Sequence, residues 1–496
     1  MMSILFALLA FTQFANGNIG TDHHHPNVII MHINNLYWND LGIHVNRKDH
    51  ENATPNIDYL AYSGIILNRF YANGGIESLL SGCYKTSEYG NTNLLANYFQ
   101  RNGYQVNFVS RQNFDKIDAF EAEVLNAISN DQTPFLLVTD FGHVGVDINI
   151  PFVDEIVASI MTKAHDIDAM NNTIFLFLSL PDNNESPLEI NIRRTAFIYS
   201  PLLSLQQRVS NQIIHVIDLL PTLVNASSLK WKTKDVIYVD GINQWSALNT
   251  NDEERLDVFG TNFYISSLWK LTYDGNDDDG FYGSIRNENM ESDMDLTDFD
   301  FLSYVQTIFS SEIQRIFDKL SSEKIMYTRM RAKVHCNLKD IDSSAVENIR
   351  CSHASPCLFN LMEDPCEYDN KFEKEFDHRR EQMKNIHERF LNGEDIESPS
   401  IKDVEGFLED GAMVGIILGG TVVGCICIFI VVVCVKEQCN KKRSVYHSRS
   451  GTTITQQPSN ESRVENGYLK EMSNGDPFPI STVSRNVKFD ERVSSA

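Results

Sequence analysis

Basic residues are scarce in this sequence of 496 residues. Lysine and arginine together number 42, against 67 aspartates and glutamates, and the formal net charge is −25. Proteins that bind nucleic acid or heparin need basic surfaces, so this composition disfavours binding to polyanions in bulk. Apolar residues make up 42% of the chain, which excludes a wholly disordered protein and provides for a large core.

Long hydrophobic runs are also few, and the two that stand out lie near the ends. Residues 1–17 (MMSILFALLAFTQFANG) form a short apolar run that ends in small residues, as a signal peptide does. Residues 411–435 (GAMVGIILGGTVVGCICIFIVVVCV) carry no charge and suffice for one transmembrane helix. Positive charge marks the cytosolic side, and the basic residues Lys436, Lys441, Lys442 and Arg443 follow this run. We therefore expect a single-pass type I membrane protein of the secretory pathway, in the plasma membrane or the endosome/lysosome membrane, with its N-terminal domain outside the cytosol.

The charge distribution agrees with this topology. Residues 436–496 contain 10 basic and 7 acidic residues, a net charge of +3, whereas the remainder contains 32 and 60, a net charge of −28. The segment 436–496 is polar and rich in serine, which predicts a disordered cytosolic tail. Within it, Asp476, Pro477 and Phe478 resemble a ligand of clathrin adaptors. We expect no nucleic-acid partner.

Cysteines and glycosylation sequons fit an outer part in an oxidising compartment, where disulfides persist. We expect one disulfide between Cys357 and Cys366 and another between Cys336 and Cys351, which leaves Cys83 unpaired. N-x-S/T sequons, which predict glycosylation on this side of the membrane, begin at Asn52, Asn171, Asn184 and Asn225.

Strands and helices alternate along residues 18–254. Apolar, β-branched runs predict strands at 26–33, 105–110, 134–139, 174–180 and 196–199. Helical patterns cover 55–64, 92–101, 158–170 and 213–224, the last broken near Pro221. This alternation predicts an α/β domain whose mainly parallel sheet is covered by helices on both faces. We expect a smaller α+β subdomain at 255–370 and a charged helix and stalk at 371–410.

Several segments, in this order, resemble the sulfatase family and particularly its arylsulfatase B-like branch. They are PNVIIMHINNLYWNDLGIH from Pro26, TPNIDYLAYSGIILNRFYANG from Thr54, LLSGCY from Leu79, IIHVIDLLPTLV from Ile213, DGINQW from Asp240, WKLTYDG from Trp269 and PCLFNLMEDPCEYDN from Pro356. The resemblance implies an alkaline-phosphatase-like α/β sandwich with a smaller C-terminal sheet. It also implies hydrolysis of sulfate esters by a formylglycine, made from the Cys of C-x-P-x-R, with Ca²⁺ held by Asp and Asn oxygens.

The chain departs from the family at the nucleophile. The motif would lie between Tyr71 and Leu79, where residues 72–78 read ANGGIES, with no Cys, Pro or Arg and a shorter segment. No other cysteine begins a C-x-P-x-R motif. We therefore expect no intact catalytic residue.

The metal positions are also altered. The first family pair, two adjacent Asp, is replaced by Asn34 and Asn35, and the second survives as Asp182 and Asn183. Asparagine offers a carbonyl oxygen but no charge, so we expect no cofactor, or at most weak Ca²⁺ binding. The alternative is that Asn34 and Asn35 cap a helix or turn.

Two further residues are vestigial candidates by the same resemblance. Arg111 stands where the family has a Lys after the second strand, and His143 falls near a family His after the third. A solvated loop for Arg111 and a surface position for His143 are alternatives. We expect Arg193 and Arg194 to be a solvated pair.

These departures predict a membrane-anchored, sulfatase-like pseudoenzyme without sulfuric ester hydrolase activity. Its ectodomain would bind an extracellular protein or glycan, or act as a regulator, at the cell surface or in endosomes. The alternative is a divergent arylsulfatase-type sulfuric ester hydrolase with a weakened metal site, a changed nucleophile and Arg111 holding the anion. An exon missing from the gene model would explain the absent motif, but not Asn34 and Asn35.

Overall fold

The computed structural model describes residues 25–34, 36–44, 54–84, 93–128, 133–181, 187–229, 239–274, 298–317, 320–334, 351–367, 369–371 and 373–394. The predicted signal peptide at 1–17, membrane span at 411–435 and tail at 436–496 lie outside these ranges. Within them, no helix has the length and apolar character needed to cross a membrane.

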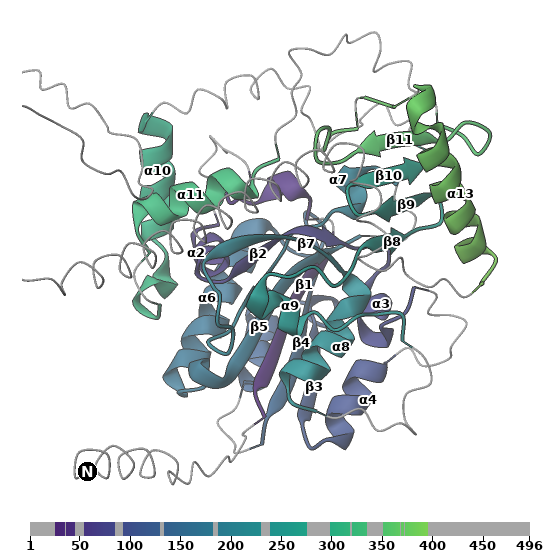
Figure 1. Ribbon diagram of the computed structural model, residues 1–496. Helices are drawn as coiled ribbons and strands as arrows, with labels where there is room; N and C mark the ends of the chain where they lie inside the picture. Colours follow the sequence, from purple (N-terminus) through teal and green to yellow (C-terminus); the bar gives the residue numbers. More distant parts are fainter. Residues whose placement is uncertain are drawn as a thin grey trace, which may run out of the picture. The chain divides into compact units, whose positions relative to one another are not determined.

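A seven-stranded sheet forms the centre of the described structure (Figure 1). Its strands are β3 (Gln105–Ser110), β4 (Phe135–His143), β1 (Asn27–Asn34), β5 (Thr173–Leu180), β6 (Ala196–Tyr199), β2 (Ile65–Tyr71) and β7 (Arg208–His215), in that order. Only β6 runs antiparallel to its neighbours β5 and β2. The carboxyl ends of the other strands therefore meet at one edge, which we call the carboxyl edge, and their starts lie at the opposite amino edge.

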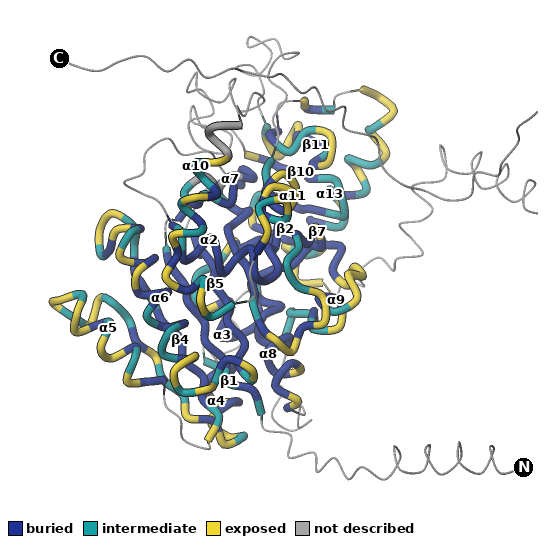
Figure 2. The backbone as a smooth tube through the Cα atoms, turned by 90° about the vertical axis from the view of Figure 1, so that its left-hand side faces the viewer, coloured by how far each residue is buried: buried dark blue, intermediate teal, exposed yellow. Residues whose placement is uncertain are grey.

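Helices cover both faces of this sheet. One face carries α2 (Pro55–Ser63), α5 (Ile117–Asn126) and α6 (Ile150–Asp166), and the other carries α3 (Ile76–Ser81), α4 (Leu94–Arg101), α8 (Leu219–Ala226) and α9 (Trp245–Thr250). Alternate residues of β1 enter opposite cores: Met31 packs with α2 and α6, and Ile30 packs with α4 and α8. Figure 2 shows the strands buried between helices whose outer turns are exposed. The predicted α/β class with a mainly parallel sheet is confirmed.

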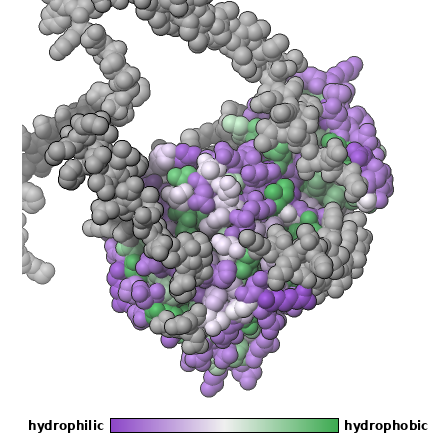
Figure 3. Space-filling model, turned by 60° about the horizontal axis from the view of Figure 1, so that its bottom comes forward, coloured by the Kyte–Doolittle hydropathy of each residue, from purple (hydrophilic) through white to green (hydrophobic). Residues whose placement is uncertain are grey.

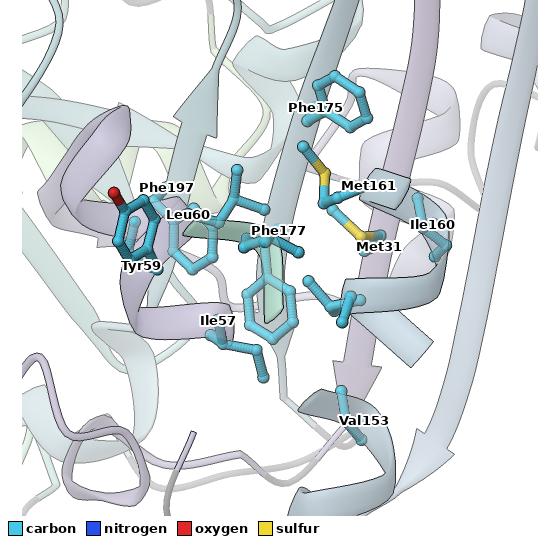
Figure 4. Close-up of a cluster of buried hydrophobic side chains, with 14 of the residues drawn as sticks. Met31, Ile57, Tyr59, Leu60, Val153, Ile160, Met161, Phe175, Phe177 and Phe197 are labelled. Carbon is cyan, nitrogen blue, oxygen red and sulfur yellow. The ribbon is translucent and has the colours of Figure 1, made fainter. Parts of the chain in front are cut away.

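Aromatic and aliphatic side chains fill the core under α2 and α6 (Figure 4). Phe177 of β5 and Phe197 of β6 stack with ring centroids 5.0 Å apart, and Met31 and Met161 lie beside them. Apolar residues on both faces of β1 and β5 explain why these strands read as continuous hydrophobic runs.

Several elements differ from the prediction, which also did not include α3, α5 and α9. The segment 213–224 is not one helix, because β7 continues to His215 and α8 begins at Leu219. The β-branched residues of β7 pack into the sheet, and the His215 amide donates to the Asp218 carboxylate at the turn that starts α8. Strand β2 was not predicted. Helix α6 already starts at Ile150, where the Asn149 side chain accepts from the Phe152 amide.

A four-stranded antiparallel sheet forms a second layer, in the order β11 (Cys357–Asn360), β10 (Trp269–Thr272), β9 (Phe263–Ser266) and β8 (Asp257–Phe259). The charged helix α13 (Asp377–Leu391) packs on it. Met383 and His387 of this helix are buried, and His387 Nε2 lies 2.8 Å from the Gly260 carbonyl oxygen. The segment 371–410, expected to form a charged helix and stalk, thus contains a helix that packs against the small sheet.

Helices α10 (Asp298–Phe309) and α11 (Ser322–Ala332) follow the small-sheet strands β8 to β10 in sequence but pack on the large domain. Val305 and Ile325 belong to the same core as α2 and α6. The Tyr304 hydroxyl donates to the Asp58 carboxylate at 3.0 Å, which joins α10 to α2. The Arg329 guanidinium lies 3.8 Å from the centroid of the Tyr304 ring.

The disulfide pattern differs from both predicted pairs. Cys351 is bonded to Cys357, with Cα atoms 5.2 Å apart. A turn at Ser352–Ser355 reverses the chain and brings the two sulfurs together at the start of β11. Cys366 is also disulfide-bonded, and Cys83 is buried and outside any disulfide, as predicted.

Candidate functional site

Asn34 and His143 lie side by side at the carboxyl edge. Asn34 ends β1, and the strand register places it between His143 of β4 and Leu180 of β5. The structure thus brings together two of the residues proposed from the sequence. Asn35, Asp182 and Asn183 lie outside the described residues. Where side chains are described, no three or more His, Cys, Asp or Glu gather in a way that could hold a metal ion.

Asp147 holds His143 in place. Its carboxylate accepts a hydrogen bond from the His143 amide at 2.8 Å, lies 3.3 Å from His143 Nδ1, and accepts from Gln112 Nε2 at 3.2 Å. These hydrogen bonds, the one from the amide most strongly, lower the pKa of Asp147. The His143 side chain is about 30% exposed. The imidazole is therefore accessible at the edge, beside an ionised carboxylate.

Arg111 turns back on its own loop. It begins the short turn after β3, and its guanidinium donates to the Phe114 carbonyl oxygen three residues on. Arg111 is partly buried in this turn, whereas the alternative considered from the sequence was a solvated loop. This geometry gives no support to Arg111 as the group that holds a substrate anion.

The segment 72–78, in which the resemblance places a nucleophile, begins with a short connection whose side-chain contacts are made by an amide. Strand β2 ends at Tyr71 and α3 starts at Ile76, so only residues 72–75 connect them. Asn73 Oδ1 lies 2.8 Å from His215 Nε2, and Asn73 Nδ2 donates to the Phe259 carbonyl oxygen at 2.6 Å. The connection is therefore tied to β7 and to the small sheet, and the remaining residues of the segment 72–78, which include Ser78, lie in α3.

His215 is a structural histidine. It is fully buried, and burial, with the nearby Arg255 as a smaller cause, holds its pKa well below the usual value. A neutral imidazole fits its contacts: Nε2 donates to Asn73, and Nδ1 accepts from the Ile217 amide at 3.4 Å. Both nitrogens are used, so His215 cannot accept a proton from a substrate without breaking the turn.

A row of polar residues near the carboxyl edge was not predicted from the sequence. Ser110, Asp140 and His32 occupy matching positions on β3, β4 and β1. The Ser110 hydroxyl donates to Asp140 at 2.8 Å, and His32 Nε2 lies 3.5 Å from the other Asp140 oxygen. Burial lowers the pKa of His32. In the sequence, the feature that could have indicated this row is a polar residue near the end of each of the three strands.

The order of this row does not suit nucleophilic catalysis. A serine nucleophile needs a base at its hydroxyl, and the base is then oriented by a carboxylate. Here the carboxylate of Asp140 stands between Ser110 and His32. The Ser110 proton is therefore held by Asp140, and His32 does not face it.

Arg193 and Arg194 reach the carboxyl edge because β6 runs in the opposite direction and starts there. The expectation of a solvated pair is wrong: Arg193 is 6% exposed and Arg194 is 0% exposed. Arg193 donates to the Asn68 carbonyl oxygen at 2.6 Å, and its guanidinium lies 4.7 Å from the Trp38 ring. The Arg194 guanidinium lies 5.5 Å from the Tyr37 ring. Both guanidinium groups therefore lie in the interior at this part of the edge.

No protein-family model matches this chain. The solved structures that resemble it include sulfatases. The crystal structure of Ps i-CgsB aligns with a TM-score of 0.50 at 14% identity, over 76% of this chain and 94% of that chain. The PsFucS1 sulfatase from Pseudoalteromonas sp. aligns with a TM-score of 0.49 at 13% identity, over 75% and 91%. BT4656 in complex with its substrate D-glucosamine-2-N,6-O-disulfate aligns with a TM-score of 0.46 at 12% identity, over 74% and 98%.

At these identities the likeness concerns the fold. The protein has a sulfatase-like α/β fold, with a mostly parallel sheet between layers of helices.

Proposed function

We propose that this protein is a sulfatase-like pseudoenzyme, which keeps the fold but does not hydrolyse sulfuric esters. The observation that carries the proposal is the connection 72–75 between β2 and α3. It begins the segment 72–78 in which the resemblance places the nucleophile, and its one polar side chain, Asn73, is bonded to His215 and Phe259. The rest of that segment, Ile76, Glu77 and the buried Ser78, forms the first turn of α3 and contains no cysteine. An amide in this bonding state neither attacks sulfur nor becomes an aldehyde.

The groups around this connection support the same conclusion. Ester hydrolysis needs a proton donor or acceptor and a cation at the leaving oxygen. His215 is neutral with both nitrogens engaged, and Asp140 is held by Ser110 and His32. Asn34 replaces a carboxylate at the metal position, which lowers the charge available to a divalent cation. The proposal accordingly includes weak or absent Ca²⁺ binding.

We further propose that the ectodomain is a binding or regulatory module, anchored by the span at 411–435. A net charge of −28 outside the cytosolic tail repels sulfated glycans over about 8 Å in physiological salt. An anionic partner therefore needs a local positive site on the surface of the ectodomain. We also propose a protein partner outside the cytosol. A clathrin adaptor would bind Asp476–Phe478 in the cytosol.

The full chain, purified in detergent from secretory cells, tests the absence of hydrolysis. Release of sulfate from a chromogenic aryl sulfate and from sulfated monosaccharides is measured with added Ca²⁺, beside an active sulfatase. We expect a rate equal to the buffer blank. The matched control is the double variant Asn34→Ala, His143→Ala. Turnover in the unaltered chain that this variant loses would overturn the proposal.

Metal analysis of the same sample separates the divergent hydrolase. A stoichiometric divalent ion that survives dialysis, together with sulfate release, would establish that alternative. A sample without the ion and without turnover supports the pseudoenzyme.

A further inference from the structure

Two exposed asparagines of N-x-S/T sequons lie at the amino edge of the large sheet. Asn171 belongs to the short turn Met170–Asn172 that leads into β5. Asn225 lies in the last turn of α8, which starts at the carboxyl edge after β7 and runs back. Both side chains are exposed, so an added oligosaccharide would point into solvent.

A single residue joins the two sequons. His25 precedes β1, and its Nδ1 lies 2.8 Å from the carbonyl oxygen of Ser227, the third residue of the second sequon. Its own carbonyl oxygen accepts from Asn172 Nδ2, in the first sequon, at 3.3 Å. The sequons at 171–173 and 225–227 therefore lie next to each other around His25, although they are distant in sequence.

An apolar turn borders the first sequon. The Ser200 hydroxyl donates to the carbonyl oxygen of Thr173 at 2.9 Å, so the turn that follows β6 begins beside this sequon. Leu202 and Leu205 in this turn are 41% and 42% exposed. Figure 3, which looks onto the lower end of the molecule in Figure 1, shows small apolar patches between polar surfaces. A group that covered these side chains would remove apolar surface from water.

We propose that Asn171 and Asn225 carry neighbouring N-linked glycans, and that these glycans cover the apolar turn at Leu202 and Leu205. The inference rests on the secretory location included in the proposed function. In the transfer, the amide nitrogen of each asparagine forms a bond to the anomeric carbon of a lipid-pyrophosphate-linked oligosaccharide. The bond from that carbon to the pyrophosphate oxygen breaks, and the amide gives up one proton.

The folded structure also fixes when the transfer takes place. The sequon hydroxyls of Thr173 and Ser227 belong to fully buried residues, and the Thr173 hydroxyl donates to the Ala169 carbonyl oxygen at 2.7 Å. A transferase that must reach these hydroxyls finds them only in the unfolded, newly made chain. The glycans are therefore present before β5 and α8 pack.

Glycopeptide mass spectrometry of the full chain from secretory cells measures occupancy at each sequon. We expect glycans at both Asn171 and Asn225, with each lost separately in Asn171→Gln and Asn225→Gln. Asn126→Gln, at an exposed asparagine outside any sequon, is the matched control and leaves both glycans in place. Bare asparagines at both positions, with glycans at Asn52 or Asn184, would overturn the inference and leave the secretory location intact. Absence of glycan at all four would overturn both.

Covering of the turn is tested by hydroxyl-radical footprinting before and after enzymatic removal of the glycans from the native protein. We expect oxidation of the peptide that contains Leu202 and Leu205 to rise at least twofold. Leu302 on α10, which is 55% exposed, is the control and should not change. Equal oxidation of the turn in both samples would overturn the covering. Neither measurement depends on sulfate release, so the pseudoenzyme proposal is judged separately.

Discussion

Arg255 donates two hydrogen bonds to the carboxylate of Asp218, at 2.7 Å from Nε and 2.6 Å from Nη2. Both side chains are buried, and the His215 amide donates to the same carboxylate. The pair therefore joins the turn between β7 and α8 to the start of the small sheet. Because both side chains are buried, water cannot solvate either charge if its partner is removed.

Arg255→Met should destabilise the protein strongly. The substitution leaves a buried, uncompensated carboxylate at Asp218, which typically costs about 3–5 kcal/mol. We expect this loss in the free energy of unfolding, measured by urea denaturation of the purified chain. The exposed pair of Arg389 with Glu394 provides the control, because Arg389→Met should cost about 1 kcal/mol or less. Equal effects of the two variants would contradict the prediction.

Stability should rise as the pH falls from neutral to mildly acidic. Lys270 Nζ lies 2.6 Å from Glu367 and 3.4 Å from Glu189, and the Tyr71 hydroxyl donates to Glu189 at 3.2 Å. Two carboxylates share one ammonium, and burial, as the main cause, raises the pKa of Glu367 to about 7. The folded state then binds this proton more tightly than the unfolded state, so the contribution is present below about pH 4.5 and is lost as the pH rises through about 7.

Thermal unfolding at pH 5.5 and pH 7.5 measures this effect. We expect a higher midpoint at pH 5.5, and a smaller difference in Glu367→Gln, which cannot ionise. Glu363→Gln alters an exposed neighbour and should keep the full difference. A pH difference that is unchanged in Glu367→Gln would assign the effect to other groups.

Asp154→Ala should weaken the start of α2. Asp154, on α6, accepts hydrogen bonds from the Asn56 amide at 3.0 Å and from the Ile57 amide at 2.8 Å. It therefore satisfies two amides that have no partner within the helix. Loss of such a cap costs about 1–2 kcal/mol, which we expect in urea denaturation. Glu155→Ala, at the exposed neighbouring position, should change stability by less than about 0.5 kcal/mol. Similar losses would show that the cap is not the cause.

The second disulfide should join Cys366 to Cys336. Cys366 is disulfide-bonded, Cys351 is bonded to Cys357, and Cys83 takes no part in a disulfide. Of the cysteines that the sequence places outside the cytosol, only Cys336, which lies outside the described residues, then remains. Peptide mapping without reduction should recover this pair together with Cys351–Cys357. Recovery of Cys357 linked to Cys366 would contradict both the structure and this prediction.

Strands that are buried on both faces could be predicted from the sequence. Segments whose apolar pattern fits both a strand and a helix could not. β1 and β5 appear as unbroken apolar runs because each of their faces meets a helix layer. The run at 213–224 contains a strand followed by a helix, and apolar periodicity alone does not separate the two. The disulfide between Cys351 and Cys357 depends on a local turn that spacing does not reveal.

The candidate site was predictable only in part, because much of it depends on strand direction and register. Asn34 and His143 could be proposed from a family resemblance. The burial of Arg193 and Arg194 follows from the antiparallel course of β6, which nothing in its sequence indicates. The row of Ser110, Asp140 and His32 requires the register between β3, β4 and β1.

The ion cluster of Lys270, Glu189 and Glu367 has a mechanical consequence. Helix α13 is the last described element of the chain, and it packs on the small sheet. Tension arriving from the C-terminal side would therefore load this helix and the small sheet first. Lys270 joins that sheet to Glu189 of the large domain through buried charges. These charges resist separation, because an ion that loses its partner in the interior is left uncompensated. Separation of the small sheet from the large domain would thus leave Lys270 without its two carboxylate partners.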